Sequence, residues 1–260
     1  MDRLILLSFD LEEFDAPIEF GQDIPEETQF DVPIRGMDVI LPALDRLGIR
    51  ATFFVTALFA MRNPALIRKV AEKHELASHG LRHSGFSNAD LKRSREIIEE
   101  ITGLPVAGFR RPRLAPTDHG LIWEAGYRYN SSENPIWLPG RYNNLMSPRR
   151  AYFSGELLNI PASVSPWFRV PLFWLAFKNF PWFVIRAASW QTLIVDLYLS
   201  IYFHPYEFTD LRSFRLPWYI KRHAGLRMLK RLDSYLCWLK RYGRFARMDE
   251  FDSFYRRRSR

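Results

Sequence analysis

Short apolar runs alternate with stretches of helical periodicity along the first half of the chain. The apolar and β-branched runs predict buried strands at residues 4–9, 51–56, 76–78 and 106–109. Apolar residues at helical spacing predict helices at residues 37–47, 64–74, 88–101 and 117–125. An alternation of this kind is typical of parallel strands joined by crossover helices.

The pattern is less regular elsewhere. Residues 15–33, rich in Pro, Gln, Glu and Asp, predict a long loop. Prolines and turn residues remove the periodicity from residue 138 to 171, and Lys178 and Pro181 interrupt the aromatic stretch that follows, which is too short and too broken to span a bilayer. Further elements are predicted at residues 197–203 (strand), 222–242 (helix) and 245–248 (strand).

No internal repeat or low-complexity linker divides the chain. We therefore predict one domain over residues 1–260, with an aromatic insertion at about 138–190. The composition agrees, because 47% hydrophobic residues can fill a large core and 25% charged residues exclude a disordered chain.

Polar side chains follow the predicted strands at the points where they end. They are Asp10, Glu12 and Glu13 after the first strand, and then His79 with His83, Arg110, Asn130 and His204 after later ones. The carboxyl ends of parallel strands share one mouth of a barrel, where active sites collect. The recurrence predicts an α/β fold, a (β/α) barrel with its site at that mouth. For the acids alone, a solvated turn is the alternative.

The two histidines are spaced for a metal. His79 and His83 lie four residues apart, and on a helical turn both rings would share one face. A carboxylate from Glu12 would complete a site of two nitrogens and one oxygen, with positions left open for water and substrate. Zinc suits these ligands best, and cobalt, nickel or iron are alternatives.

The net charge of +8 is unevenly distributed, since acids crowd the first hundred residues and Arg and Lys dominate from about Arg212. A basic end suits nucleic acid, an anionic membrane or an acidic substrate, unless it is only a solvated face. No nucleic-acid signature is present, so we expect no such partner. The single cysteine, Cys237, can form no internal disulfide, and the start of the chain has no signal-peptide pattern, so we expect a cytoplasmic protein.

Five short motifs in order resemble those of the polysaccharide deacetylase family (carbohydrate esterase family 4, the NodB-homology domain). They are Ser8-Phe9-Asp10-Leu11-Glu12, His79 with His83, Phe109-Arg110-Arg111-Pro112, Gly126-Tyr127-Arg128-Tyr129-Asn130, and Ile201-Tyr202-Phe203-His204-Pro205. The resemblance covers residues 3–135 and 195–255, and it implies a distorted, seven-stranded (β/α) barrel.

The resemblance also implies roles. Asp10 would be the catalytic base, with Arg110 orienting it, and His204 the group that protonates the leaving amine. Glu12, His79 and His83 would hold one divalent ion, most suitably Zn²⁺, and from the third and fourth motifs Pro112, Tyr129 and Asn130 would contact the substrate.

The motifs depart from the family pattern in three places. Leu11 separates two acids that are commonly adjacent, which leaves Glu13 as an alternative to Glu12. Gly80 stands where many members have Ser or Thr. Asn130, a neutral residue, replaces the Asp of the usual acid–His pairing.

These inferences predict a metal-dependent deacetylase that removes an N-acetyl or formyl group from an amino sugar, a polysaccharide or a lipid-linked saccharide. Two alternatives stay open. One is a hydrolase of non-sugar cyclic amides with the same fold, and the other is a non-catalytic carbohydrate-binding relative, suggested by Asn130.

The aromatic segment 167–186 suggests where the substrate is met. Residues 167–183 contain three Trp and five Phe, and Arg169, Lys178 and Arg186 flank them. Tryptophan with basic flanks is favoured at a membrane interface, which suggests peripheral contact with the inner membrane face. The alternative is an inserted helix that packs against the barrel.

Overall fold

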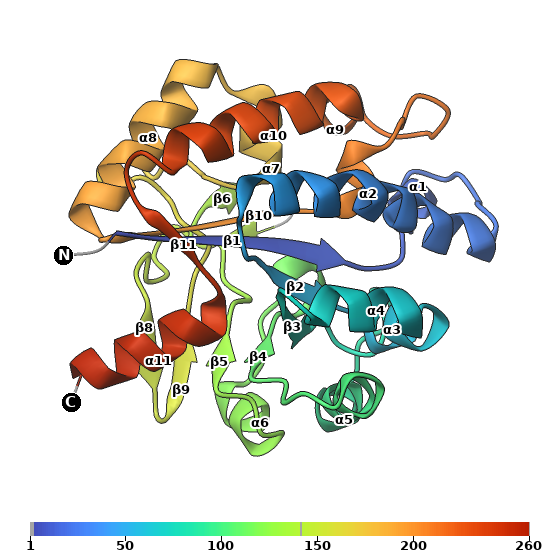
Figure 1. Ribbon diagram of the computed structural model, residues 1–260, viewed down its shortest axis with the longest axis horizontal. Helices are drawn as coiled ribbons and strands as arrows, with labels where there is room; N and C mark the ends of the chain where they lie inside the picture. Colours follow the sequence, from blue (N-terminus) through green and yellow to red (C-terminus); the bar gives the residue numbers. More distant parts are fainter. Residues whose placement is uncertain (1–2, 141, 260) are drawn as a thin grey trace.

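The sheet is built around one central strand. The structure, a computed structural model, describes residues 3–140 and 142–259. Strand β1 (Leu4–Leu11), deep blue in Figure 1, is buried along its whole length. It pairs in parallel with β10 (Tyr198–Phe203) on one side. On the other side its first half pairs with β11 (Arg244–Ala246) and its second half with β2 (Thr52–Val55), so few of its backbone groups lack a partner.

The remaining strands continue the sheet and curl it. They are β3 (Glu75–Ser78), β4 (Gly108–Phe109), β5 (Tyr129–Asn130), β9 (Leu157–Asn159) and β8 (Tyr152–Ser154). Their order is β10-β1-β2-β3-β4-β5-β9-β8, and only β8 is antiparallel to its neighbour. The strands turn from lengthwise at β1 to upright at β5 and β9 in Figure 1. The Ser163 N–H donates to the Ser200 carbonyl at 2.9 Å, which brings the chain after β9 back to β10. The predicted α/β fold, a distorted (β/α) barrel, is confirmed.

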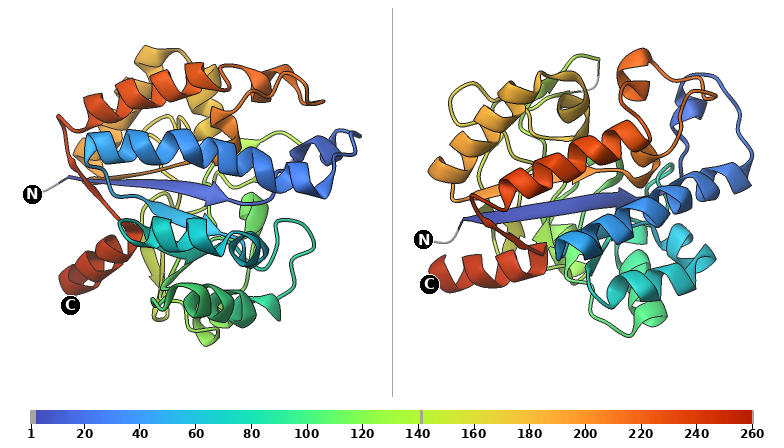
Figure 2. Two further views of the ribbon diagram at one scale, coloured as in Figure 1. Left: turned by 45° about the vertical axis from the view of Figure 1, so that its right-hand side comes forward. Right: turned by 45° about the horizontal axis from the view of Figure 1, so that its top comes forward.

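Helices cover the outside of this sheet (Figures 1 and 2). Those that follow the strands are α2 (Glu26–Leu47), α3 (Ala57–Arg62), α4 (Pro64–Ala71), α5 (Asp90–Thr102), α6 (His119–Glu124), α8 (Trp182–Val195) and α10 (Leu226–Leu239). Shorter helical segments are α1 (Ala16–Glu19), η1 (Pro112–Leu114), α7 (Trp174–Asn179), η2 (Pro205–Phe208) and α9 (Trp218–Lys221). The final helix, α11 (Met248–Ser259), was not predicted and packs at the end where β1 begins.

The two faces of β1 have different neighbours because side chains alternate along a strand. Ile5, Leu7 and Phe9 pack into the large core beneath the helices. Leu4 and Leu6 face the inside of the barrel, where they pack in a second core with Met248 and Phe251 of α11. Ser8 and Asp10 continue this row of inward-facing side chains. The row is therefore apolar at the start of β1 and polar at its carboxyl end.

The predicted loop over residues 15–33 is wrong, because most of it is helical. Helix α2 begins after Pro25, with Glu26 and Glu27 in its first turn, where acids interact favourably with the helix dipole. Pro33 lies inside the helix and has no N–H to donate to the Gln29 carbonyl. The Phe14 N–H donates to that carbonyl instead, at 2.8 Å, which fastens the acidic turn after β1 to α2.

The segment predicted as an aromatic insertion is joined to the main sheet. It contributes β8 and β9 to the main sheet, a small hairpin of β6 (Trp137–Leu138) and β7 (Tyr142–Asn143), and helices α7 and α8. The three basic residues of segment 167–186 are engaged within the protein. Lys178 is buried, Arg169 donates to the Pro135 and Ser147 carbonyls, and Arg186 lies over the Trp182 ring.

We expect Gly36→Ala to destabilise the protein. Gly36 is in α2, and a Cβ there would lie 2.0 Å from the backbone oxygen of Pro205, next to His204. Helix propensity alone favours alanine by about 0.5–1 kcal/mol, whereas overpacking costs about 1–3 kcal/mol. Urea unfolding should therefore show a net loss for Gly36→Ala. Asp38→Ala, at an exposed position of the same helix, is the control. Equal or greater stability of Gly36→Ala would contradict the tight contact between α2 and η2.

Candidate active site

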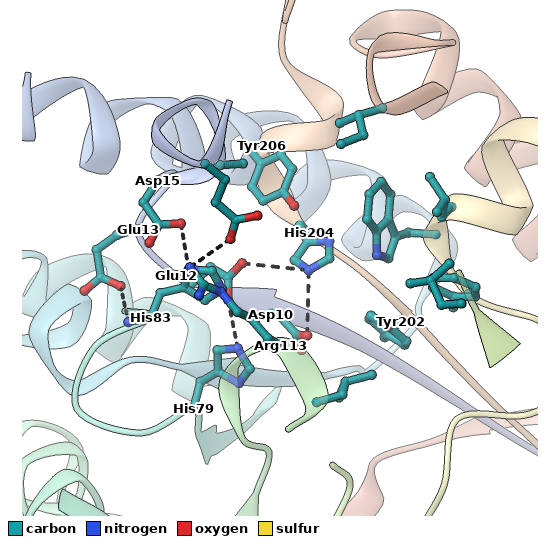
Figure 3. A pocket seen from close by; sticks show the side chains of 18 of the residues that line it. Asp10, Glu12, Glu13, Asp15, His79, His83, Arg113, Tyr202, His204 and Tyr206 are labelled. Atoms are coloured by element: carbon teal, nitrogen blue, oxygen red, sulfur yellow. Dashed lines mark hydrogen bonds and ion pairs between the residues drawn. The ribbon is translucent and has the colours of Figure 1, made fainter. Parts of the chain in front are cut away.

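A cavity of about 400 Å³ opens at the carboxyl ends of β1, β3 and β10 (Figure 3). Its polar side contains Asp10, Glu12, Glu13, Asp15, Glu19, His79, His83, Arg113 and His204. Its apolar side includes Phe173, Trp174 and Leu175 at α7, together with Tyr202, Leu138 and Ile220. Polar groups that converge beside an apolar wall are the usual form of a small-molecule site.

Glu12 lies between the two histidines of the second motif. Its Oε2 is 2.8 Å from His79 Nε2 and 3.5 Å from His83 Nε2. The histidines lie in a loop after β3 and not on a helical turn, and Gly80 adopts a positive φ of 80° between them. The rings are stacked with centroids 6.4 Å apart. The loop therefore brings both imidazole rings to the Glu12 carboxylate without a helical turn.

The far nitrogen of each histidine is held by a separate acceptor. His79 Nδ1 is 2.8 Å from the Arg110 carbonyl oxygen, and His83 Nδ1 is 2.6 Å from Asp15 Oδ1. Each ring therefore donates through Nδ1 and turns Nε2 toward Glu12, which is the usual orientation of a metal-binding histidine. Asp15 was not among the predicted site residues, although it lies in the same acidic stretch as Glu12.

The electrostatics of Glu12 and His83 are coupled. Burial would raise the pKa of Glu12, but the charge of His83 and the hydrogen bond with His79 outweigh it and lower the pKa to about 2. Burial lowers the pKa of His83, but Glu12 and Asp15 outweigh it and raise the pKa to about 9. Glu12 is thus ionised as a ligand must be, whereas His83 would have to lose a proton to bind a metal.

These three side chains have the donor chemistry of a zinc-type site, but they are not yet spaced for one. Two ligands at 2.0–2.1 Å in a tetrahedral site lie about 3.3 Å apart. The 3.5 Å between Glu12 and His83 suits this, whereas the 2.8 Å between Glu12 and His79 is a direct hydrogen bond. Among residues 3–140 and 142–259, no group of three or more His, Cys, Asp or Glu is arranged as a preformed metal site. A shift of about half an ångström between Glu12 and His79 would bring this pair to the spacing of two ligands.

Glu13, the alternative ligand, faces elsewhere. Its carboxylate accepts hydrogen bonds from the Thr56 hydroxyl at 3.1 Å and from the His83 N–H at 3.1 Å. It therefore holds the loop that carries His83, while Glu12 meets the imidazole rings. Burial raises the pKa of Glu13.

Asp10 forms a buried ion pair with Arg110. The Arg110 NH1 group donates to Asp10 Oδ1 at 2.5 Å, and both side chains are almost fully buried. The same guanidinium donates to Ser8 Oγ and to the carbonyl and hydroxyl oxygens of Ser131, so its position is fixed from β1 and from the chain after β5. Asp10 Oδ2 stays on the side of the cavity, 3.9 Å from His204 Nε2.

His204 approaches the same carboxylates from β10 (Figure 3). Its Nε2 is 3.8 Å from Glu12 Oε1, and its Nδ1 is 2.9 Å from Glu207 Oε1. Burial lowers the pKa of His204, but Glu207 and Glu12 outweigh it and raise the pKa. Glu207 was not among the predicted site residues. The one indication in the sequence was its position three residues after His204, in His204-Pro205-Tyr206-Glu207.

The structure does not bring the three expected substrate-binding residues to the cavity. Tyr129 is fully buried, and its hydroxyl donates to Glu75 at the opposite end of β3. Asn130 donates to Asn159 and accepts from Ser132, and Pro112 is buried behind Arg113 and Leu114, which do line the cavity. Whether a side chain at a strand end points into the cavity or away from it depends on how the sheet curls. The spacing of residues along the sequence does not reveal this curl.

Comparison with known proteins agrees with the motifs. The family model of polysaccharide deacetylases matches residues 30–129, which confirms the predicted resemblance. A Pseudomonas aeruginosa PAO1 protein, provisionally assigned as a polysaccharide deacetylase, is 18% identical, with 98% of this chain and 91% of that chain covered and a TM-score of 0.67.

Two other solved structures share the fold. The Puue allantoinase is 18% identical, with 96% of this chain and 89% of that chain covered and a TM-score of 0.65. A pseudoenzyme of carbohydrate esterase family 4 from Bacillus anthracis is 13% identical, with 96% and 66% covered and a TM-score of 0.51. At these identities the likeness establishes the fold, and the chemistry has to be argued from the site.

Proposed function

We propose that this chain, which has the fold and the motifs of polysaccharide deacetylases, is a metal-dependent hydrolase that removes an N-acetyl or formyl group from an amino sugar. The sugar would be part of a polysaccharide or a lipid-linked saccharide. The observation that carries the proposal is the convergence of Asp10, Glu12 and His204 on one cavity, with His204 Nε2 3.9 Å from Asp10 and 3.8 Å from Glu12. The match to the family model supports a hydrolase.

Glu12, His79 and His83 would hold one divalent ion. Two imidazole nitrogens and a carboxylate suit Zn²⁺ best, with Co²⁺, Ni²⁺ or Fe²⁺ as alternatives. When bound, such an ion polarises the amide carbonyl and lowers the pKa of a water. Asp15 and the Arg110 carbonyl would keep the two rings in the ligating orientation.

The protein's own groups supply the proton transfers. Asp10 accepts the proton of the attacking water through the oxygen that Arg110 leaves free, Oδ2. Arg110 holds the other oxygen, Oδ1, in an ion pair and so fixes the orientation of the carboxylate. His204 donates its Nε2 proton to the nitrogen of the leaving group as the carbon–nitrogen bond breaks, which releases a carboxylic acid and a free amine.

The apolar side of the cavity favours a sugar ring as the rest of the substrate. Trp174, Tyr202 and Tyr219 line it opposite the carboxylates, and aromatic faces beside polar groups suit the mixed surface of a saccharide.

Two alternatives have specific support. A cyclic ureide or another non-sugar amide needs the same proton transfers, and the allantoinase shares this fold. A non-catalytic carbohydrate-binding protein is suggested by Asn130 in the fourth motif and by the pseudoenzyme with the same fold. Acetate release, formate release and ureide hydrolysis by the metal-loaded protein distinguish these possibilities.

We also propose peripheral membrane contact, through a narrower part of segment 167–186 than the sequence suggested. Trp167 and Phe168 are 68% and 81% exposed at the tip of a turn closed by a hydrogen bond from the Ser165 N–H to the Val170 carbonyl. This turn directly precedes Phe173 and Trp174 of the cavity wall, so a lipid-linked saccharide could reach the cavity from a membrane surface. No helix in the described part of the chain is long and apolar enough to cross a bilayer. The expected cytoplasmic location stays a prediction.

Metal binding should depend on Glu12 and not on Glu13. Glu12→Gln, His79→Ala and His83→Ala should each lower the metal content at least tenfold, because each removes one ligand. Glu13→Gln is the matched control, since its carboxylate contacts Thr56 and the His83 backbone. Elemental analysis after dialysis measures the effect. Equal loss in Glu13→Gln, or full metal content in Glu12→Gln, would disprove this ligand set.

Asp10→Asn should abolish most turnover while the metal stays bound, because it removes the proton acceptor and none of the proposed metal ligands. We expect at least a hundredfold lower kcat for acetate release from chitooligosaccharides. His204→Ala should slow these amides far more than 4-nitrophenyl acetate, whose leaving group needs no proton. Equal losses on amide and ester would argue against His204 as the proton donor.

Vesicle sedimentation tests the membrane contact. The wild-type protein should sediment with anionic phosphatidylglycerol vesicles, and Trp167→Ser with Phe168→Ser should release it, because the exposed rings provide the apolar contact. Trp123→Ser, an exposed tryptophan on α6, is the control. No sedimentation of the wild type, or no effect of the double variant, would refute the contact.

A further inference from the structure

One buried acid contacts His204 on the side away from the cavity. Glu207 Oε1 is 2.9 Å from His204 Nδ1 and also accepts the His204 backbone N–H at 2.9 Å. Both contacts arise because η2 turns the chain directly after His204, so that the carboxylate three residues later folds back onto it. One oxygen thus fixes the ring and the backbone of the same residue.

Glu207 has no access to solvent, and its second oxygen faces a buried lysine. Glu207 Oε2 makes no hydrogen bond among the described residues and lies 3.5 Å from Lys178 Nζ. Lys178 is itself buried and donates to the Ile220 carbonyl at 2.8 Å. A buried carboxylate without a counter-charge is strongly unfavourable, so Lys178 is the group that stabilises Glu207 in this position.

Helix α7 supplies this lysine together with a ring that packs on His204. Trp174 and Lys178 lie four residues apart and so project from one face of α7. The Trp174 ring stands edge-on to His204 with centroids 5.3 Å apart, and Tyr206 stacks nearly parallel to His204 at 4.9 Å. The aromatic segment therefore encloses His204 as well as reaching the surface.

We propose that Glu207 is the positioning residue of His204, and that Lys178 is the counter-charge that keeps Glu207 in place. Nδ1–H donates to Glu207, which leaves Nε2 directed at Asp10 and Glu12 in the cavity. Asn130 cannot take this part, because its amide is engaged with Asn159 and Ser132. The consequence for catalysis rests on the proposed function, in which His204 protonates the leaving amine.

The decisive variant replaces both members of the buried pair, Glu207→Leu with Lys178→Met. Exchanging a buried ion pair for apolar side chains is often neutral for stability, so this protein should fold. Asp252→Asn is the matched control, because it removes another buried carboxylate. Asp252 lies on α11 and pairs with Arg256 of the same helix and with Arg128, which precedes β5.

The first readout is independent of activity. Two-bond proton–nitrogen NMR of ¹⁵N-histidine-labelled, zinc-loaded protein reports which ring nitrogens carry protons, and a His204→Gln sample identifies the signal. Nδ1 of His204 should be protonated in the wild type and in Asp252→Asn. In the double variant the Nε2–H tautomer should dominate, because Asp10 and Glu12 remain beside Nε2. An unprotonated Nδ1 in the wild type, or an unchanged signal in the double variant, would overturn the proposal.

The second readout is turnover. The double variant should lower kcat on chitooligosaccharides about 10- to 100-fold, with KM within about twofold and a smaller effect on 4-nitrophenyl acetate. A kcat within threefold of the wild type would contradict the positioning role. If the wild type hydrolyses neither substrate, the proposed function fails, and the NMR signal still decides the role of Glu207.

Lys178→Met alone tests the counter-charge. It leaves Glu207 buried without its partner, so its Tm should lie about 5 °C or more below that of the double variant. Equal Tm values would show that Glu207 does not need Lys178.

Discussion

The buried guanidinium of Arg110 is the contact on which the barrel mouth depends. It joins Ser8 and Asp10 of β1 to Ser131 after β5, two segments that lie on opposite sides of β2, β3 and β4 in the sheet. The Arg110 carbonyl also accepts His79 Nδ1, so one residue orients both the candidate base and one candidate metal ligand. Removing one partner of such a buried pair typically costs about 3–5 kcal/mol. Loss of Arg110 would therefore disturb both the site and the contact between β1 and the chain after β5.

A second buried ion pair contacts His204, the candidate proton donor. Glu207 and Lys178 lie behind His204, as Arg110 lies behind Asp10. In each pair the acidic and the basic residue come from different elements of the fold. The cavity is thus polar on the side of β1 and β3 and aromatic on the side of α7, and His204 stands where the two sides meet.

This arrangement gives the irregular middle of the chain a structural purpose. The stretch that loses periodicity after residue 137 contributes two strands to the sheet and then α7, whose Trp174 and Lys178 enclose His204. The exposed rings of Trp167 and Phe168 lie just before this wall. Segment 167–186 therefore forms part of the cavity wall and also exposes aromatic rings at the surface. A packed helix and an exposed contact surface are not exclusive alternatives for it.

The sequence by itself determined the class of fold and most of the chemistry. Alternating strand and helix patterns predict the parallel barrel, and the polar residues at strand ends include Asp10, Glu12, His79, His83, Arg110 and His204, which the structure gathers at one mouth. These inferences succeed because periodicity and strand direction are local properties, and parallel strands bring their carboxyl ends together.

Only the tertiary structure decided which neighbour each side chain meets. It turned Glu12 and not Glu13 toward the imidazoles, directed Tyr129 to Glu75 at the far end of the barrel, and paired His204 with Glu207. It also made residues 26–33 helical, because Phe14 supplies the hydrogen bond that Pro33 cannot. Such choices depend on the curl of the sheet and on contacts between residues far apart in the chain, and a pattern of residue types along one dimension does not contain them.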